Sequence, residues 1–94
     1  MTRARFVVRG VVQGVNFRAA TAREASTRGL TGRVWNTADG AVGVIAEGEA
    51  GAVAELEAWL GHGPRMAEVD RVDRADLEGA PRYRDFRIAY DAPE

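Results

Sequence analysis

Apolar and polar residues alternate in the first segment of the chain. In residues 4–8 the even positions are apolar, and Arg5 lies between two of them. Because side chains of a strand point alternately to its two faces, this period of two predicts a half-buried strand. The alternation returns in residues 30–37 and 42–46. The Asp39-Gly40 pair between these two runs predicts a hairpin.

Two other stretches have the spacing of helices. Residues 17–28 hold no glycine or proline and are rich in alanine, and Gly29 stands where a helix C-terminal glycine belongs. Residues 50–60 have apolar side chains at helical spacing, followed by Gly61 and then by Gly63-Pro64. The apolar positions of this second helix are Val53, Leu56 and Leu60.

The C-terminal third predicts two more strands. The first is marked by Ala67, Val69 and Val72, and the change of parity between the two valines indicates a bulge or a shift of face. The second is marked by the alternating residues Phe86, Ile88 and Tyr90.

The element order is therefore β-α-β-β-α-β with an extra terminal strand. It predicts an α+β ferredoxin-like sandwich, with two helices over one antiparallel sheet, formed by a single domain over residues 1–94. The first two strands of such a unit run parallel with another strand between them. Their C-terminal ends share one edge of the sheet, so Arg18 and Asn36 are expected to face each other there.

Composition limits the classes of partner. The 94 residues are 46% apolar and carry a formal net charge of −1, which suits a small globular domain without a general attraction for nucleic acid. No apolar run approaches the roughly 20 residues that span a bilayer. The absence of cysteine is compatible with a cytosolic location. We expect a cytoplasmic protein that acts as a monomer, without membrane or nucleic-acid partners.

Residues 10–18, GVVQGVNFR, join the first strand to the first helix and have the chemistry of an anion cradle. N–H groups at a helix start carry partial positive charge, and glycine lets a ligand approach the backbone closely. Arg18 adds a planar guanidinium suited to a phosphate. The N–H groups expected to bind phosphate are those of Gly14, Val15, Asn16, Phe17 and Arg18.

The chain lacks the residues that most other hydrolytic mechanisms require. The chain has no cysteine or lysine, one serine (Ser26) and one histidine (His62), so a thiolate nucleophile, a Walker P-loop and a His/Cys zinc site cannot be assembled. Ser26 inside a helix and His62 in a loop are not placed to form a triad. Three carboxylates recur at close spacing: Asp70, Asp73 and Asp76. They could hold a hard cation, although we favour a charged face exposed to solvent. We expect no metal and no cofactor.

A binding module remains an alternative. Ferredoxin-like domains also bind RNA or a regulatory ligand through the open face of the sheet. That face would carry Trp35, which lies opposite Val34 in phase and is expected to be partly exposed, whereas Trp59 is expected to pack. The other residues of the face would be Arg3, Arg5, Val7, Arg9 and Arg33.

Two motifs resemble the acylphosphatase family: residues 10–18 and residues 29–42, GLTGRVWNTADGAV. The similarity continues through Gly48 and the Gly63-Pro64 turn and covers nearly the whole chain. Two positions depart from the family pattern, which usually has an apolar, aromatic or glycine residue at position 16 and a basic one at position 35. The family also occurs as a segment of larger carbamoyl-transfer enzymes, but the length of this chain favours a free-standing enzyme.

The resemblance implies a fold and an activity. Acylphosphatases have the ferredoxin-like fold and hydrolyse acyl phosphates to a carboxylate and inorganic phosphate, without a metal. By this resemblance, Arg18 holds the phosphate and Asn36 positions the attacking water, while the N–H groups from Gly14 to Arg18 complete the cradle. Since no nucleophile is present, direct attack by water is expected.

Overall fold

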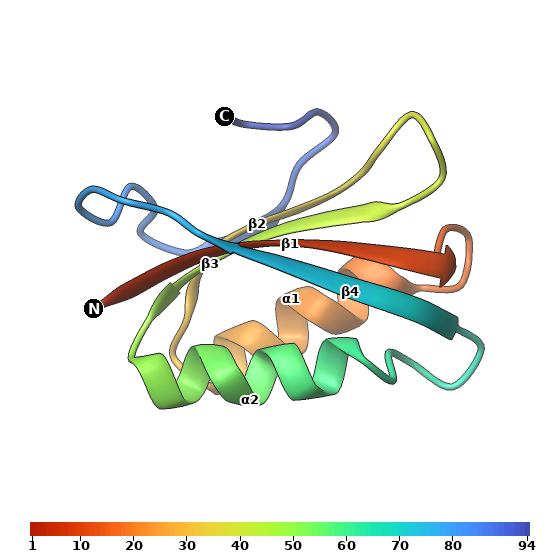
Figure 1. Ribbon diagram of the computed structural model, residues 1–94, viewed down its shortest axis with the longest axis horizontal. Coiled ribbons are helices and arrows are strands. Elements are labelled where there is room, and N and C mark those ends of the chain that lie inside the picture. Colours follow the sequence, from red (N-terminus) through yellow and green to blue (C-terminus); the bar gives the residue numbers. More distant parts are fainter.

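Five strands form one sheet, and both helices cover the same face of it (Figure 1). The computed structural model describes all 94 residues. No helix is long and apolar enough to cross a membrane. The elements in chain order are β1 (Thr2–Val11), α1 (Phe17–Thr27), β2 (Thr31–Asn36), β3 (Val42–Gly48), α2 (Ala50–Leu60), β4 (Glu68–Asp76) and β5 (Phe86–Ile88).

The strand order β4-β1-β3-β2-β5 confirms the predicted sandwich. β3 pairs antiparallel with both β1 and β2, so β1 and β2 run parallel on either side of it. Val42 in β3 lies opposite Val8 of β1 and also opposite Asn36 of β2. The end of β2 and the end of β1 therefore meet at one edge of the sheet.

The last strand differs from the expectation in two ways. β5 pairs parallel with β2, so the sheet is mixed and not wholly antiparallel. β5 also ends at Ile88, and Tyr90 is 87% exposed instead of continuing the strand. The alternation of residues 86–90 shows only which faces side chains prefer; the direction of pairing depends on which neighbouring edge is free.

The core between the sheet and the helices consists of the positions that the periodicity indicated. β1, β3 and α2 each contribute three buried apolar side chains. Trp59 of α2 packs on Phe17 with ring centroids 5.7 Å apart. The fully buried members include Phe6 and Val8 from β1 and Val53, Leu56 and Leu60 from α2.

The predicted irregularity of β4 is a β-bulge. Arg9 pairs with Arg71, but Gly10 pairs with Val69, so Asp70 has no partner in β1. Gly10 has a φ of 132°, and a Cβ there would lie 2.1 Å from the carbonyl oxygen of Glu68. Only glycine permits this approach, and the bulge bends the pair of strands immediately before the loop that follows β1.

The outer face of the sheet is not an open aromatic surface. Trp35 is 2% exposed, which corrects the expectation that it is partly exposed. Its ring lies over Gly43, where a Cβ would approach within 2.4 Å, and the Arg5 guanidinium lies 5.3 Å from the ring centroid. The C-terminal segment also runs on this side, opposite the helices (Figure 1). The stacking platform that an RNA-binding sheet requires is therefore missing.

A buried carboxylate anchors the loop between β4 and β5 to this outer face. Glu47, 1% exposed, accepts hydrogen bonds from Arg3 Nε at 2.6 Å and from the backbone N–H groups of Arg82 and Tyr83 at 3.0 Å. Burial alone would raise the pKa of Glu47, but the hydrogen bonds from Arg82, Arg3 and Tyr83 outweigh it and lower the pKa. The carboxylate is therefore held in its ionised form.

We predict that Glu47→Gln lowers the free energy of unfolding by about 3 kcal/mol at pH 7. It removes the buried carboxylate that Arg3 and two backbone N–H groups share, and leaves Arg3 paired only with the more exposed Glu94. The wild-type protein gains this stability fully above the ordinary Glu pKa of about 4.3 and loses it as the pH falls through the lower pKa of folded Glu47. Urea unfolding between pH 7 and pH 3 measures both effects. Glu55→Gln, at a carboxylate that is 69% exposed, is the matched control; equal losses in the two variants would contradict the assignment.

Candidate active site

The protein has one pocket, at the edge of the sheet where β1 and β2 end. It has a volume of about 140 Å³ and is lined by the loop after β1, the first turn of α1, the end of β2 and β5. The lining residues are Val12, Gly14, Asn16, Phe17, Arg18, Ala19, Asn36 and Ile88.

The structure brings together most of the residues that the sequence singled out. Gly14, Asn16, Phe17, Arg18 and Asn36 all line the pocket. Of the five residues predicted to bind phosphate through their N–H groups, only Val15 is absent from the lining, because its side chain packs on the core. The parallel arrangement of β1 and β2 accounts for the meeting of two motifs that lie far apart in the sequence.

Two left-handed residues shape the loop between β1 and α1. Gly14 has a φ of 77°, and Asn16, at the N-cap of α1, has a φ of 68° and a ψ of 22°. Asn16 is the only residue other than glycine with a positive φ. Asparagine enters this region at lower cost than most residues, so it suits the left-handed backbone at this position.

The N–H groups of this loop have no partner within the protein. None of residues 14–19 donates a backbone hydrogen bond, and the first such bond of α1 runs from the Ala20 N–H to the Asn16 carbonyl. The Asn16 side chain does not cap the helix, and no acidic residue stands in the first turn. The helix start therefore presents free donors and a partial positive charge to the pocket.

Arg18 is half-buried and makes no ion pair or hydrogen bond, whereas Arg3, Arg9 and Arg33 each pair with a carboxylate. The guanidinium of Arg18 gives the pocket a positive charge. The other lining residues are all uncharged. An anion with several oxygens, such as a phosphate, suits this set of donors.

Asn36 contributes a hydrogen-bond acceptor that has no partner in the protein. Its Oδ1 is one of three buried side-chain polar atoms that lack a hydrogen-bond partner, and the other two, in Thr21 and Arg28, belong to residues outside the pocket lining. An unpartnered buried oxygen is unfavourable unless a water or a ligand supplies a donor. Asn36 is therefore the one lining residue with an unpartnered buried side-chain acceptor.

The sequence reasoning missed Gln13. Its Nε2 donates to the carbonyl oxygens of Thr37 at 2.9 Å and Ala41 at 2.8 Å, which tie the cradle loop to the turn after Asn36. The only sequence signal was that Gln13, with Asn16, is one of two amide side chains between β1 and α1, where the other residues are valine or glycine. The Thr37 hydroxyl holds the turn through hydrogen bonds with Asp39 and with the backbone of Ala41. Its hydrogen bond to Asp39, with a smaller contribution from the hydrogen bond of Arg9, lowers the pKa of Asp39 to about 2.

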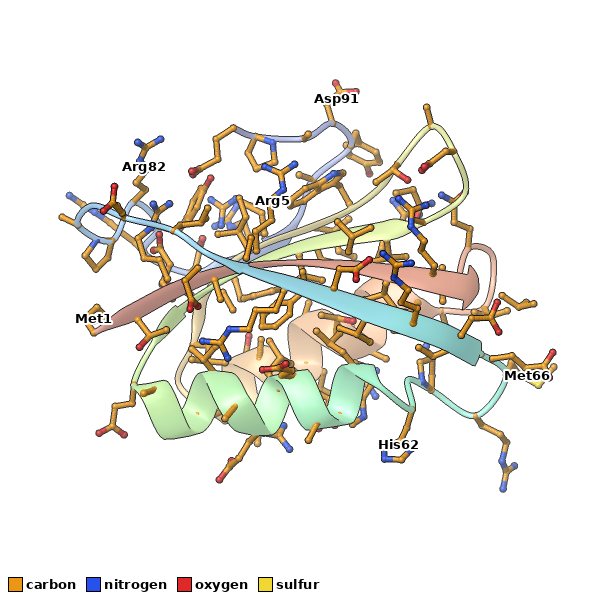
Figure 2. The ribbon with its side chains drawn as sticks, viewed as in Figure 1. Met1, Arg5, His62, Met66, Arg82 and Asp91 are labelled. Atoms are coloured by element: carbon orange, nitrogen blue, oxygen red, sulfur yellow. The ribbon has the colours of Figure 1, made fainter.

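The residues considered for other chemistries lie elsewhere. His62 is exposed in the turn after α2, below the helical layer in Figure 2, and Ser26 is exposed near the end of α1. Asp73 and Asp76 pair with Arg71 and Arg74 in β4. No group of three or more His, Cys, Asp or Glu side chains is placed to hold a metal ion.

Comparisons with known proteins agree with the fold and the motifs. A family model described as Acylphosphatase matches residues 4–88. The acylphosphatase of Xanthomonas euvesicatoria pv. vesicatoria is 54% identical over 86 residues, which cover 92% of this chain and 97% of that protein. The chain belongs to the acylphosphatase family. The acylphosphatase of Mannheimia succiniciproducens is 42% identical over 90 residues, 96% of this chain and 100% of its own length.

Solved structures of acylphosphatases have the same fold. The Bacillus subtilis acylphosphatase aligns with a TM-score of 0.92 and 32% identity, over 96% of this chain and 100% of that one. The acylphosphatase of Coxiella burnetii aligns with a TM-score of 0.89 and 36% identity, over 94% and 92% of the two chains. T. kodakarensis HypF aligns with 98% of this chain, but this region is only 12% of the HypF chain.

We predict that Gln13→Ala weakens the binding of inorganic phosphate several-fold, because the loop must then be ordered at the cost of binding energy. Loss of the two hydrogen bonds should also lower the free energy of unfolding by about 1–2 kcal/mol. Titration calorimetry and urea unfolding measure the two effects. Thr27→Ala, which removes a side chain–backbone hydrogen bond far from the loop, is the control; wild-type phosphate affinity in Gln13→Ala would contradict the role.

Proposed function

We propose that the protein hydrolyses the carboxyl–phosphate bond of small acyl phosphates by direct attack of water, with Arg18 and the loop N–H groups binding the phosphoryl group and Asn36 positioning the water. Acylphosphatases, the family to which the chain belongs, are metal-independent acylphosphate phosphohydrolases. The observation that carries the assignment of residues is that unpaired donors and an unpaired acceptor meet in one pocket.

The cradle supports the phosphoryl group in two ways. The N–H groups of residues 14–18 and the Arg18 guanidinium offer hydrogen bonds to the non-bridging oxygens, and their positive charge opposes the negative charge that the group carries. Because the loop is held by Gln13 and by the start of α1, these donors need little reorganisation when the transition state forms. Positioning and electrostatic stabilisation are the main requirements of phosphoryl transfer.

Asn36 orients the nucleophile. Its Oδ1 accepts a hydrogen bond from a water molecule, whose oxygen attacks phosphorus while the bond from phosphorus to the acyl oxygen breaks. The bonding pair leaves with the carboxylate, which is a good leaving group and needs no general acid. An amide is too weak a base to remove the proton of water, so a phosphate oxygen of the substrate accepts it, and inorganic phosphate is the second product.

We further propose that the enzyme acts as a monomer. The support is that one chain supplies every group that the proposed mechanism uses: the loop N–H groups, Arg18 and Asn36. A net charge of −1 gives no reason to expect nucleic acid at this site.

Arg18→Ala is expected to lower kcat/KM for benzoyl phosphate by 100-fold or more. The clamp contributes roughly 1.5–3 kcal/mol to the bound ground state and more in the transition state. Steady-state assays in the presence of a chelator measure the change. Arg23→Ala, at an exposed arginine of the same helix, should leave the rate unchanged; near wild-type efficiency of Arg18→Ala would exclude the assignment.

Asn36→Ala is expected to lower kcat by about two orders of magnitude while inorganic phosphate still inhibits competitively, because the cradle remains intact. The kinetic constants and the inhibition constant for phosphate separate the two roles. If the variant kept its turnover and lost inhibition by phosphate, Asn36 would belong to the phosphate cradle and not to the water site.

A further inference from the structure

Part of the pocket lining is apolar. Apart from Arg18 and two asparagines, no lining residue carries a polar side chain. Val12 and Phe17 are buried in the core at 1% and 2% exposure, so they offer little surface to a ligand. Ile88 is 40% exposed. It is therefore the one large apolar side chain of the lining that a bound molecule can cover.

The sheet places Ile88 beside the proposed water site. β5 pairs parallel with β2, with Ile88 opposite Val34, and the Ala89 N–H donates to the Val34 carbonyl at 2.8 Å. Val34 and Asn36 are two residues apart in one strand, so their side chains share a face of the sheet, and Ile88 lies on that face too. One strand spacing and two residues separate Ile88 from Asn36, a distance of about 8 Å between backbones.

In an in-line displacement the attacking water and the acyl group lie on opposite sides of phosphorus, and this separation leaves room for the phosphoryl group between Asn36 and Ile88. If the phosphoryl group occupies the cradle and water approaches from Asn36, the acyl group must extend out of the cradle toward another part of the pocket. Apart from the cradle residues, Asn36 and the buried Val12, the lining consists of Ile88 and the half-buried Ala19. Neither side chain can donate or accept a hydrogen bond, so contact with them favours acyl groups with apolar surface.

We propose that Ile88 binds the acyl group of the substrate and gives the enzyme a preference for aromatic and other apolar acyl phosphates. The inference rests on the proposed function, since it requires the phosphoryl group in the cradle. Ile88 is a specificity-determining residue in this assignment and takes no part in the chemical step.

Benzoyl phosphate and acetyl phosphate test the proposal, because they share the reacting group and differ in apolar surface. Ile88→Ala should raise KM for benzoyl phosphate about three- to tenfold, the range expected for lost methyl groups in a partly open site. KM for acetyl phosphate should change less than about twofold. The inhibition constant of inorganic phosphate, which has no acyl group, should stay at the wild-type value.

Ile88→Thr keeps the branched shape and the strand preference of the residue, so it tests the loss of apolar contact with little risk to folding. It should also raise KM for benzoyl phosphate selectively. Val11→Ala is the matched control, since Val11 is an exposed apolar residue at the end of β1 that does not line the pocket. This control should change neither substrate's KM.

The outcomes separate this inference from the proposed function. Equal changes in both KM values and in the phosphate inhibition constant would mean that Ile88 only supports the fold, and would overturn the inference. An unchanged KM for benzoyl phosphate in both Ile88 variants would overturn it as well, while the proposed function would stand. If the wild-type protein hydrolysed neither substrate, the proposed function itself would fail.

Discussion

The pairing of β3 with both β1 and β2 is the constraint on which the site depends. All seven residues of β3 are buried, so a slip of register would move its side chains to the wrong face of the sheet. Val42 lies between Val8 and Asn36 and fixes the two strand ends at one edge. The cradle loop and Asn36 therefore face each other because of a strand that contributes no side chain to the pocket.

The pocket is also where backbone and side-chain polar groups remain unpaired. Elsewhere the protein satisfies even a fully buried carboxylate, since Glu47 accepts bonds from Arg3 and two backbone N–H groups. At the pocket, the N–H groups of residues 14–19 and Asn36 Oδ1 are left without partners, and Asn16 adopts a left-handed conformation. The core under the sheet offsets these unfavourable terms. In the proposed mechanism, these donors are already oriented when the phosphoryl group binds.

The features that the sequence predicted correctly depend on residues close together in the chain, whereas those it missed depend on contacts between different elements. The hairpin, both helices and the bulge follow from residues close in sequence, and the structure confirms them. Trp35 was misplaced because its burial depends on Arg5 and Gly43, which reach it only through the sheet. Gln13 and Ile88 were missed as site residues for the same reason: their partners, Ala41 and Val34, belong to other elements.

The sequence by itself determined the element order, the glycine-containing loop before α1 and the two motifs that resemble acylphosphatases. Periodicity and turn chemistry act between near neighbours, so they can be read without a structure. Only the tertiary structure decided that β5 runs parallel to β2, that the outer face is closed over Trp35, and that Ile88 faces the pocket. These features depend on which strand edges and surfaces remain free after the central strands have paired, and this is a property of the whole chain.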